Sequence, residues 1–122
     1  MGVDEKSNVE ITSKDNVAVV FFKDTSISDV NGIKASSRQV NNFIEENHPA
    51  GIVFDFGGVR FFSSRVLGLV LDIRAKLGTY DGKVVISAIN PQLHRVFKIT
   101  NLDKIFRFFP DMESAVKAVS TN

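Results

Sequence analysis

The 122-residue sequence has no cysteine, no tryptophan and no long apolar run. Without cysteine there are no disulfides, thiolate nucleophiles or Cys-based metal sites, which excludes a disulfide-stabilised secreted scaffold and agrees with a reducing compartment. No apolar stretch approaches the roughly 20 residues that span a bilayer, and the polar start at residues 1–7 does not resemble a signal peptide. These absences predict a cytoplasmic protein with no membrane association.

The sequence also has no excess of charge of one sign. Fifteen basic residues balance fourteen acidic ones, and no run of like charge marks a surface for nucleic acid, so nucleic acid is not an expected partner. With 43% hydrophobic residues the chain has the composition of a folded globular protein. Its length fits one domain, which we place at residues 9–120 behind a flexible tail at residues 1–8.

Strand patterns occur at both ends and in the middle of the chain. Residues 9–13 alternate apolar and polar, residues 14–16 break the pattern, and residues 17–22 are β-branched and aromatic, which predicts an antiparallel hairpin. Residues 51–56 and 83–89 are almost wholly apolar, as parallel strands covered on both faces are. Residues 59–62 form a short extended piece in which Phe61 and Phe62 cannot both point inward, and residues 105–108 are expected to form the last strand.

Helical patterns separate these strands. They cover residues 31–46, capped by Ser28 or Asp29, then residues 63–78, and a short helix that Asn90 and Pro91 open and that ends near Ile99. Asp111 caps a closing helix whose apolar face contains Met112, Ala115, Val116 and Val119. The resulting order β-β-α-β-α-β-α-β-α predicts an α/β fold with a mixed, mostly parallel sheet and helices packed on it.

The helix expected at residues 63–78 has two unlike sides. One side is apolar and should pack on the sheet, whereas the other side gathers Arg65, Gly68, Leu69, Asp72 and Lys76. Gly68 costs this helix about 1 kcal/mol relative to alanine. Either close packing against a neighbour or a flat place where another protein's backbone approaches explains that glycine.

Two adjacent serines open this helix. A serine at such a position is most often an N-cap, so Ser63 is expected to cap the helix while Ser64 projects outward. A phosphate on Ser64 would bring about −1.5 to −2 charges to the electropositive end of the helix. The helix would tolerate that charge, whereas a docked partner would have to bury it. The pair therefore suggests an off-switch for binding.

The segment from Asp55 through Val59-Arg60-Phe61-Phe62-Ser63-Ser64-Arg65-Val66-Leu67-Gly68 resembles the signature of STAS domains of the anti-sigma-factor-antagonist type. The order of strands and helices, and Pro91 at the start of the short helix, extend the resemblance over nearly the whole chain. It implies a STAS-like fold, no catalysis, no cofactor, and an anti-sigma factor of the serine-kinase type as partner. The serine that this kinase phosphorylates corresponds to Ser64, with Ser63 as second choice.

Two departures from the signature affect that mechanism. Ser63 stands where the family has Asp, which removes an acidic group beside the hydroxyl, and Arg65-Val66 replaces Ser-Gly. Arg65 instead offers a partner for a phosphate. The surface expected to bind the partner consists of Ser63, Ser64, Arg65, Gly68, Leu69 and Asp72, with neighbouring loops at Thr25, Ser26 and Gly58.

Two rival interpretations make other use of the same residues. A hydrolase would need Ser64 as nucleophile, His48 or His94 as base, and Asp55 or Asp72 to orient the base, but no nucleophile-elbow motif is present. The same scattered histidines and carboxylates have no metal-ligand spacing, so no metal is expected.

A ligand- or nucleotide-sensing module is the second rival. It would hold a small molecule at strand ends and helix amino ends near Gly57-Gly58. A turn that needs positive φ explains these two glycines equally well.

Overall fold

The structure, a computed structural model, describes residues 8–120. Its elements are β1 (Val9–Lys14), β2 (Val17–Phe22), β3 (Ser26–Ile27), α1 (Val30–Asn47), β4 (Gly51–Asp55), β5 (Phe61–Phe62), α2 (Ser64–Gly78), β6 (Lys83–Ser87), α3 (Pro91–Ile99), a 3₁₀ turn η1 (Leu102–Lys104), β7 (Phe108–Phe109) and α4 (Met112–Ser120). The predicted strand-helix alternation is confirmed. β5 lies within the piece expected to be extended at residues 59–62, but β3 and its pairing with β5 were not predicted.

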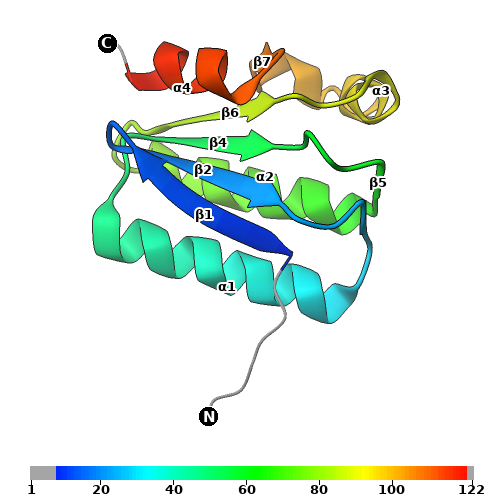
Figure 1. The fold of residues 1–122 in the computed structure, drawn as a ribbon, viewed down its shortest axis with the longest axis horizontal. Coiled ribbons are helices and arrows are strands. Elements are labelled where there is room, and N and C mark those ends of the chain that lie inside the picture. Colours follow the sequence, from blue (N-terminus) through cyan, green and yellow to red (C-terminus); the bar gives the residue numbers. More distant parts are fainter. Residues whose placement is uncertain (1–7, 121–122) are drawn as a thin grey trace.

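The main sheet has five strands in the order β1-β2-β4-β6-β7 (Figure 1). The β1–β2 hairpin is antiparallel and turns at Asp15 and Asn16, whose φ values of 54° and 63° suit a two-residue hairpin. β2, β4, β6 and β7 pair in parallel. The predicted mixed, mostly parallel sheet is therefore confirmed.

Helices cover both faces of this sheet. α1, α2 and α3 contribute to the larger core with residues such as Ile44, Ile73 and Phe97. α4 lies on the opposite face, where its Ala115, Val116 and Val119 pack on strand residues to form a smaller core (Figure 1). The apolar face predicted for the closing helix is confirmed.

The ends of the predicted elements needed three corrections. The strand expected at residues 83–89 ends at Ser87, and Ala88 after it has a positive φ of 56°. Asn8, which the sequence placed in the tail, is buried and its backbone N–H donates to Ser36 Oγ at 2.8 Å; residues 1–7 lie outside the described residues. The last strand is Phe108–Phe109, not residues 105–108, because the Leu102 carbonyl accepts from the N–H groups of Ile105 and Phe106 and coils the chain there. None of the helices described between residues 8 and 120 is both long and apolar enough to cross a membrane.

Candidate functional site

The amino end of α2 is held in place by the small β3–β5 sheet. Ser26 pairs with Phe61 and Ile27 with Phe62. The Thr25 carbonyl accepts from the N–H groups of Arg60 and Phe61 at 2.7 and 3.1 Å. The structure therefore brings the predicted loop residues Thr25 and Ser26 beside the segment that leads into α2.

The two serines have different surroundings. Ser64 is the first residue of α2 and is exposed. Ser63 occupies the N-cap position with extended backbone, φ −81° and ψ 164°, but its side chain makes no capping hydrogen bond. Ser63 Oγ is buried and has no hydrogen-bond partner among the described residues. The prediction that Ser63 caps the helix with its side chain is wrong, because its hydroxyl faces inward.

The exposed face of α2 contains three of the five predicted residues, and a fourth, Lys76, is half-buried and pairs with Glu45 at 3.0 Å. Arg65, Gly68 and Asp72 are exposed, whereas Leu69 is only 4% exposed. Leu69 follows Val66 by three residues and precedes Ile73 by four, and residues at these spacings share one side of a helix. Both are buried, so the placement of Leu69 on the outward face was wrong.

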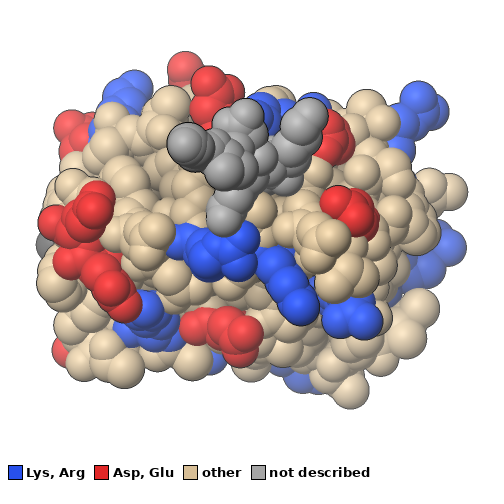
Figure 2. Space-filling view, turned by 90° about the horizontal axis from the view of Figure 1, so that it is seen from below, with Lys and Arg blue, Asp and Glu red and all other residues tan. Residues whose placement is uncertain are grey.

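Gly68 stands over open space. A Cβ built on Gly68 meets no atom within 4 Å, which excludes close packing as the reason for this glycine. Next to it, a groove of about 320 Å³ runs between α2 and the first turns of α1, lined by Val30, Ile33, Lys34, Ser37, Arg65, Gly68, Leu69 and Asp72. Leu69 thus contributes to this surface as part of the groove lining. Figure 2 shows that basic and acidic side chains are interspersed on the α1 side of the molecule.

Gly58 lies in a second hollow near the carboxyl ends of β4 and β6. The hollow measures about 550 Å³ and is lined by Gly57, Gly58, Val59, Arg60, Asn90, Pro91 and Gln92. Gly57 and Gly58 do form a turn, in which the Val59 N–H donates to the Phe56 carbonyl at 3.0 Å. Neither glycine has positive φ, so the expectation that the turn needs positive φ is wrong. The Gly57 N–H donates to Asp55 Oδ1 at 2.8 Å, and a Cβ at Gly57 would lie 3.0 Å from that oxygen. At Gly57 a Cβ would therefore force the Asp55 side chain to shift.

The residues of the hydrolase interpretation are dispersed. His48 is at the carboxyl end of α1 with its ring 5.5 Å from that of Tyr80, which follows the far end of α2. The His94 ring packs against that of Phe108 at a tilt of 39°, with ring centroids 4.2 Å apart. In the described part of the chain neither histidine is hydrogen-bonded to Ser64. Carboxylates and histidines of residues 8–120 also form no group that could hold a metal ion.

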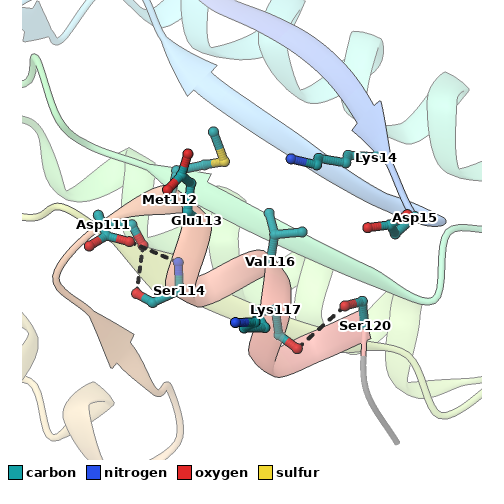
Figure 3. A pocket seen from close by; sticks show the side chains of 9 residues that line it. All are labelled: Lys14, Asp15, Asp111, Met112, Glu113, Ser114, Val116, Lys117 and Ser120. Atoms are coloured by element: carbon teal, nitrogen blue, oxygen red, sulfur yellow. Dashed lines mark hydrogen bonds between the residues drawn. The ribbon is translucent and has the colours of Figure 1, made fainter.

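A third hollow, of about 630 Å³, lies beside α4 on the other face of the sheet (Figure 3). Lys14 and Asp15 from the hairpin face Met112 and Val116 on α4, while Asp111, just before α4, accepts from the Ser114 N–H at 2.8 Å (Figure 3). None of the predicted site residues lines this hollow. It also combines both charge signs, so it has no evident preference for an ion.

Two groups away from the amino end of α2 have shifted pKa values. Burial raises the pKa of Tyr80, whose hydroxyl donates to the Pro49 carbonyl at 2.9 Å. The backbone N–H of Ser114, and then its hydroxyl, lower the pKa of Asp111 at the start of α4. Both shifts are explained by local structure and indicate no acid–base chemistry.

The structure is a small α/β domain in which Ser64, His48 and His94 of the hydrolase interpretation lie on different elements. The STAS domain family model matches residues 8–115, and the chain belongs to that family. The STAS-like fold expected from the signature around Ser64 is therefore confirmed.

Solved structures with the same fold come from several bacteria. An anti-sigma factor antagonist from Mycobacterium paratuberculosis is 25% identical, with a TM-score of 0.79 and 98% of each chain covered. Phosphorylated SpoIIAA, a Bacillus cell fate determinant, is 18% identical with a TM-score of 0.73 over 91% of this chain and 98% of its own. A STAS domain protein from Planctomyces limnophilus is 16% identical with a TM-score of 0.82 over 93% and 98%. The last two show the likeness of fold alone.

Proposed function

We propose that this chain is an anti-sigma-factor antagonist, a module that sequesters an anti-sigma factor of the serine-kinase type and releases it when Ser64 is phosphorylated. The family membership supports this proposal, as does the similarity to an antagonist over 98% of both chains. The observation that carries it is the exposed hydroxyl of Ser64 at the first residue of α2, beside an open groove. The chain itself catalyses no reaction in this scheme.

Ser64 is a better acceptor of a phosphoryl group than Ser63. Its side chain is exposed, whereas Ser63 Oγ is buried. A kinase needs the hydroxyl in line with the γ-phosphate of ATP, which a buried oxygen does not permit. Ser63 would have to rotate its hydroxyl outward first, so Ser64 is the proposed site of modification.

The partner is proposed to dock across the start of α2 and the adjoining groove. Exposed Gly68 leaves space for a partner's backbone, and Val30, 37% exposed, offers an apolar contact at the groove. Phe61 is 53% exposed next to Ser26, whereas Phe62 is buried, so Phe61 provides a second apolar contact. Phe61 precedes Ser64 by three residues and Gly68 follows it by one helical turn, so a partner that uses both contacts would bury a phosphate on Ser64.

Arg65 modifies this scheme in a way particular to the chain. Its guanidinium is exposed one residue after Ser64 and carries the charge and donors that pair with a phosphate. Such a pair would stabilise the phosphorylated form of the free protein. It would also withdraw Arg65 from any carboxylate of the partner, so both effects favour release.

A lysate pull-down with and without ATP, followed by mass spectrometry of the Ser63–Ser64 peptide, tests the proposal. We expect one partner to be retained without ATP, and ATP to add a phosphate at Ser64 and reduce the retained amount. Ser64→Ala should keep the partner in both conditions, and Ser63→Ala should behave as the wild type. Modification at neither serine, with equal retention in both conditions, contradicts the switch.

A ligand-sensing role is the second candidate, favoured by the hollow at Gly57, Gly58 and Asn90 near the carboxyl ends of β4 and β6. Ligands of open α/β sheets bind at such strand ends. Thermal-shift measurements with ATP and GTP test this role, because saturable binding to the native state raises the melting temperature. No shift at millimolar nucleotide would exclude nucleotides as the ligand.

A further inference from the structure

The edge of the sheet beside β7 is incomplete. β7 pairs only with Ile86 and Ser87, although β6 begins at Lys83. The Ile86 N–H donates to the Arg107 carbonyl at 3.0 Å, and the Ala88 N–H donates to Phe109 at 2.9 Å. The backbone N–H groups of every second residue of β6 therefore point toward the β7 side of the sheet. The Val84 N–H points the same way, but it lies beyond the end of β7. No strand within residues 8–120 lies beside Val84 there.

A groove follows this free edge. It measures about 390 Å³ and lies between the carboxyl end of α2 and α4, with Val84 and Val85 in its lining. Ile105 also lines the groove and is 40% exposed. An unpaired strand edge beside apolar side chains is a template on which another extended chain can add.

The charges around the groove are mostly positive. Arg74, Lys83 and Arg107 line it, against Asp81 as the acidic residue in the lining. The Arg74 guanidinium lies 6.0 Å from the Phe106 ring and that of Arg107 lies 5.0 Å from the Phe109 ring, contacts that hold both side chains on the fold. Among the described residues none of these three cations forms an ion pair, unlike Lys76, which lies 3.0 Å from Glu45. The groove therefore favours carboxylates.

We infer that this groove binds an extended acidic segment of another protein, which adds as a strand beside β6 at Val84. Side chains of a strand alternate, so one face of the segment can bring carboxylates to Lys83 and Arg107 on the α4 side of the sheet, while the other face meets Arg74 on the α2 side. Ile105 in the groove lining adds an apolar contact. The groove includes Gly78 at the last residue of α2, about 20 Å from Ser64 along this 15-residue helix. It is therefore a second surface, and the inference does not depend on the role of Ser64.

An end-blocked, fluorescently labelled hexapeptide of alternating valine and glutamate serves as the probe, with the valine–lysine peptide as its control. We expect saturable binding of the acidic peptide by fluorescence anisotropy, none of the basic peptide, and at least tenfold slower hydrogen exchange at the Val84 amide in the complex. Absence of saturable binding, or unchanged exchange at Val84, overturns the inference.

Two charge-reversed variants separate the groove from general electrostatic attraction. Arg107→Glu should weaken peptide binding at least tenfold, whereas Arg95→Glu, an equal change at an exposed residue outside the groove, should change it less than twofold. If Arg107→Glu lowers the melting temperature of the protein, Lys83→Glu repeats the test. Equal weakening of peptide binding by Arg107→Glu and Arg95→Glu overturns the inference. A change in peptide affinity caused by Ser64→Glu also overturns it.

Discussion

The amino ends of α1 and α2 have similar backbone surroundings but differ in side-chain capping. Each helix follows one strand of the small β3–β5 sheet, and each N-cap residue has extended backbone. At α1 the Asp29 carboxylate accepts from the Gly32 N–H at 3.0 Å, whereas at α2 the Ser63 side chain accepts nothing. The start of α1 is thus completed by its own side chain, and the start of α2 leaves backbone donors for something else.

The other two α-helices repeat the pattern of α1. Asn90 Oδ1 accepts from the Leu93 N–H at 2.9 Å to cap α3, and Asp111 Oδ1 accepts from the Ser114 N–H at 2.8 Å to cap α4. Among the four α-helices described in residues 8–120, only α2 lacks a side-chain cap. That same helix begins with the exposed Ser64, where free donors and the helix dipole favour an added negative charge.

The largest expected effect of this contrast concerns partner binding. Ser64→Glu should weaken binding of the partner retained in the pull-down at least tenfold, because a carboxylate would be buried uncompensated in the interface. Ser64→Ala should bind as the wild type. Ser13→Glu, an equal charge change at an exposed residue of β1, is the control and should have no effect. Isothermal titration calorimetry measures all four; equal affinity of Ser64→Glu and wild type contradicts the proposal.

Removing the N-cap residue should affect stability at α1 and not at α2. Asp29→Ala should lower the free energy of unfolding by about 1 kcal/mol, because it removes the cap of α1. Ser63→Ala should leave it within about 0.5 kcal/mol, because no capping bond is lost and an unpartnered buried hydroxyl is removed. Urea unfolding with Asp29→Asn as a capping-competent control checks both values. A loss at Ser63 as large as that at Asp29 would show that Ser63 caps in solution.

Gly68 allows stability and binding to be separated. Gly68→Ala should raise the free energy of unfolding by up to about 1 kcal/mol, since a Cβ there meets nothing within 4 Å. The same methyl group should weaken partner binding if the partner's backbone crosses this place. Gly78→Ala is the matched control, because Gly78 is equally open but lies at the other end of α2. A Gly68 variant that is more stable and binds as tightly as wild type would move the interface away from Gly68.

The smallest expected effect is a loss of stability in acid, caused by protonation of Asp111 at the start of α4. The Asp111 pKa is lowered from its ordinary value of 3.8 in the folded state. Its contribution to stability is therefore complete above that value and is lost as the pH falls through the folded pKa. Stability curves of wild type and Asp111→Asn should converge as the pH falls below about 4. Curves that stay parallel would show that Asp111 is not held by Ser114 in solution.

Much of the fold could be predicted because strong patterns dictated it. Residues 51–56 are a continuous apolar run, and Asn90-Pro91 combines a cap with a residue suited to a first helical turn. The β3–β5 pair was missed because two-residue strands carry no periodicity, and residues 105–108 were misplaced because a 3₁₀ turn precedes the last strand.

The site was predicted less completely for reasons of packing. Arg65, Gly68 and Asp72 were placed correctly by helical spacing, and the same spacing from the buried Val66 and Ile73 would have placed Leu69 inward. The groove that Leu69 lines depends on how α2 packs beside α1, which sequence spacing does not encode. The inward rotamer of Ser63 likewise follows from tertiary contacts, since serine at an N-cap position ordinarily bonds the helix amides.

The most direct measurement compares the partner's affinity for chain phosphorylated at Ser64 with its affinity for the unmodified chain, in the same buffer and at the same concentration. The open start of α2 predicts that the phosphorylated chain keeps its circular dichroism spectrum and binds at least tenfold more weakly. A phosphorylated chain that is folded and binds with unchanged affinity would contradict the account.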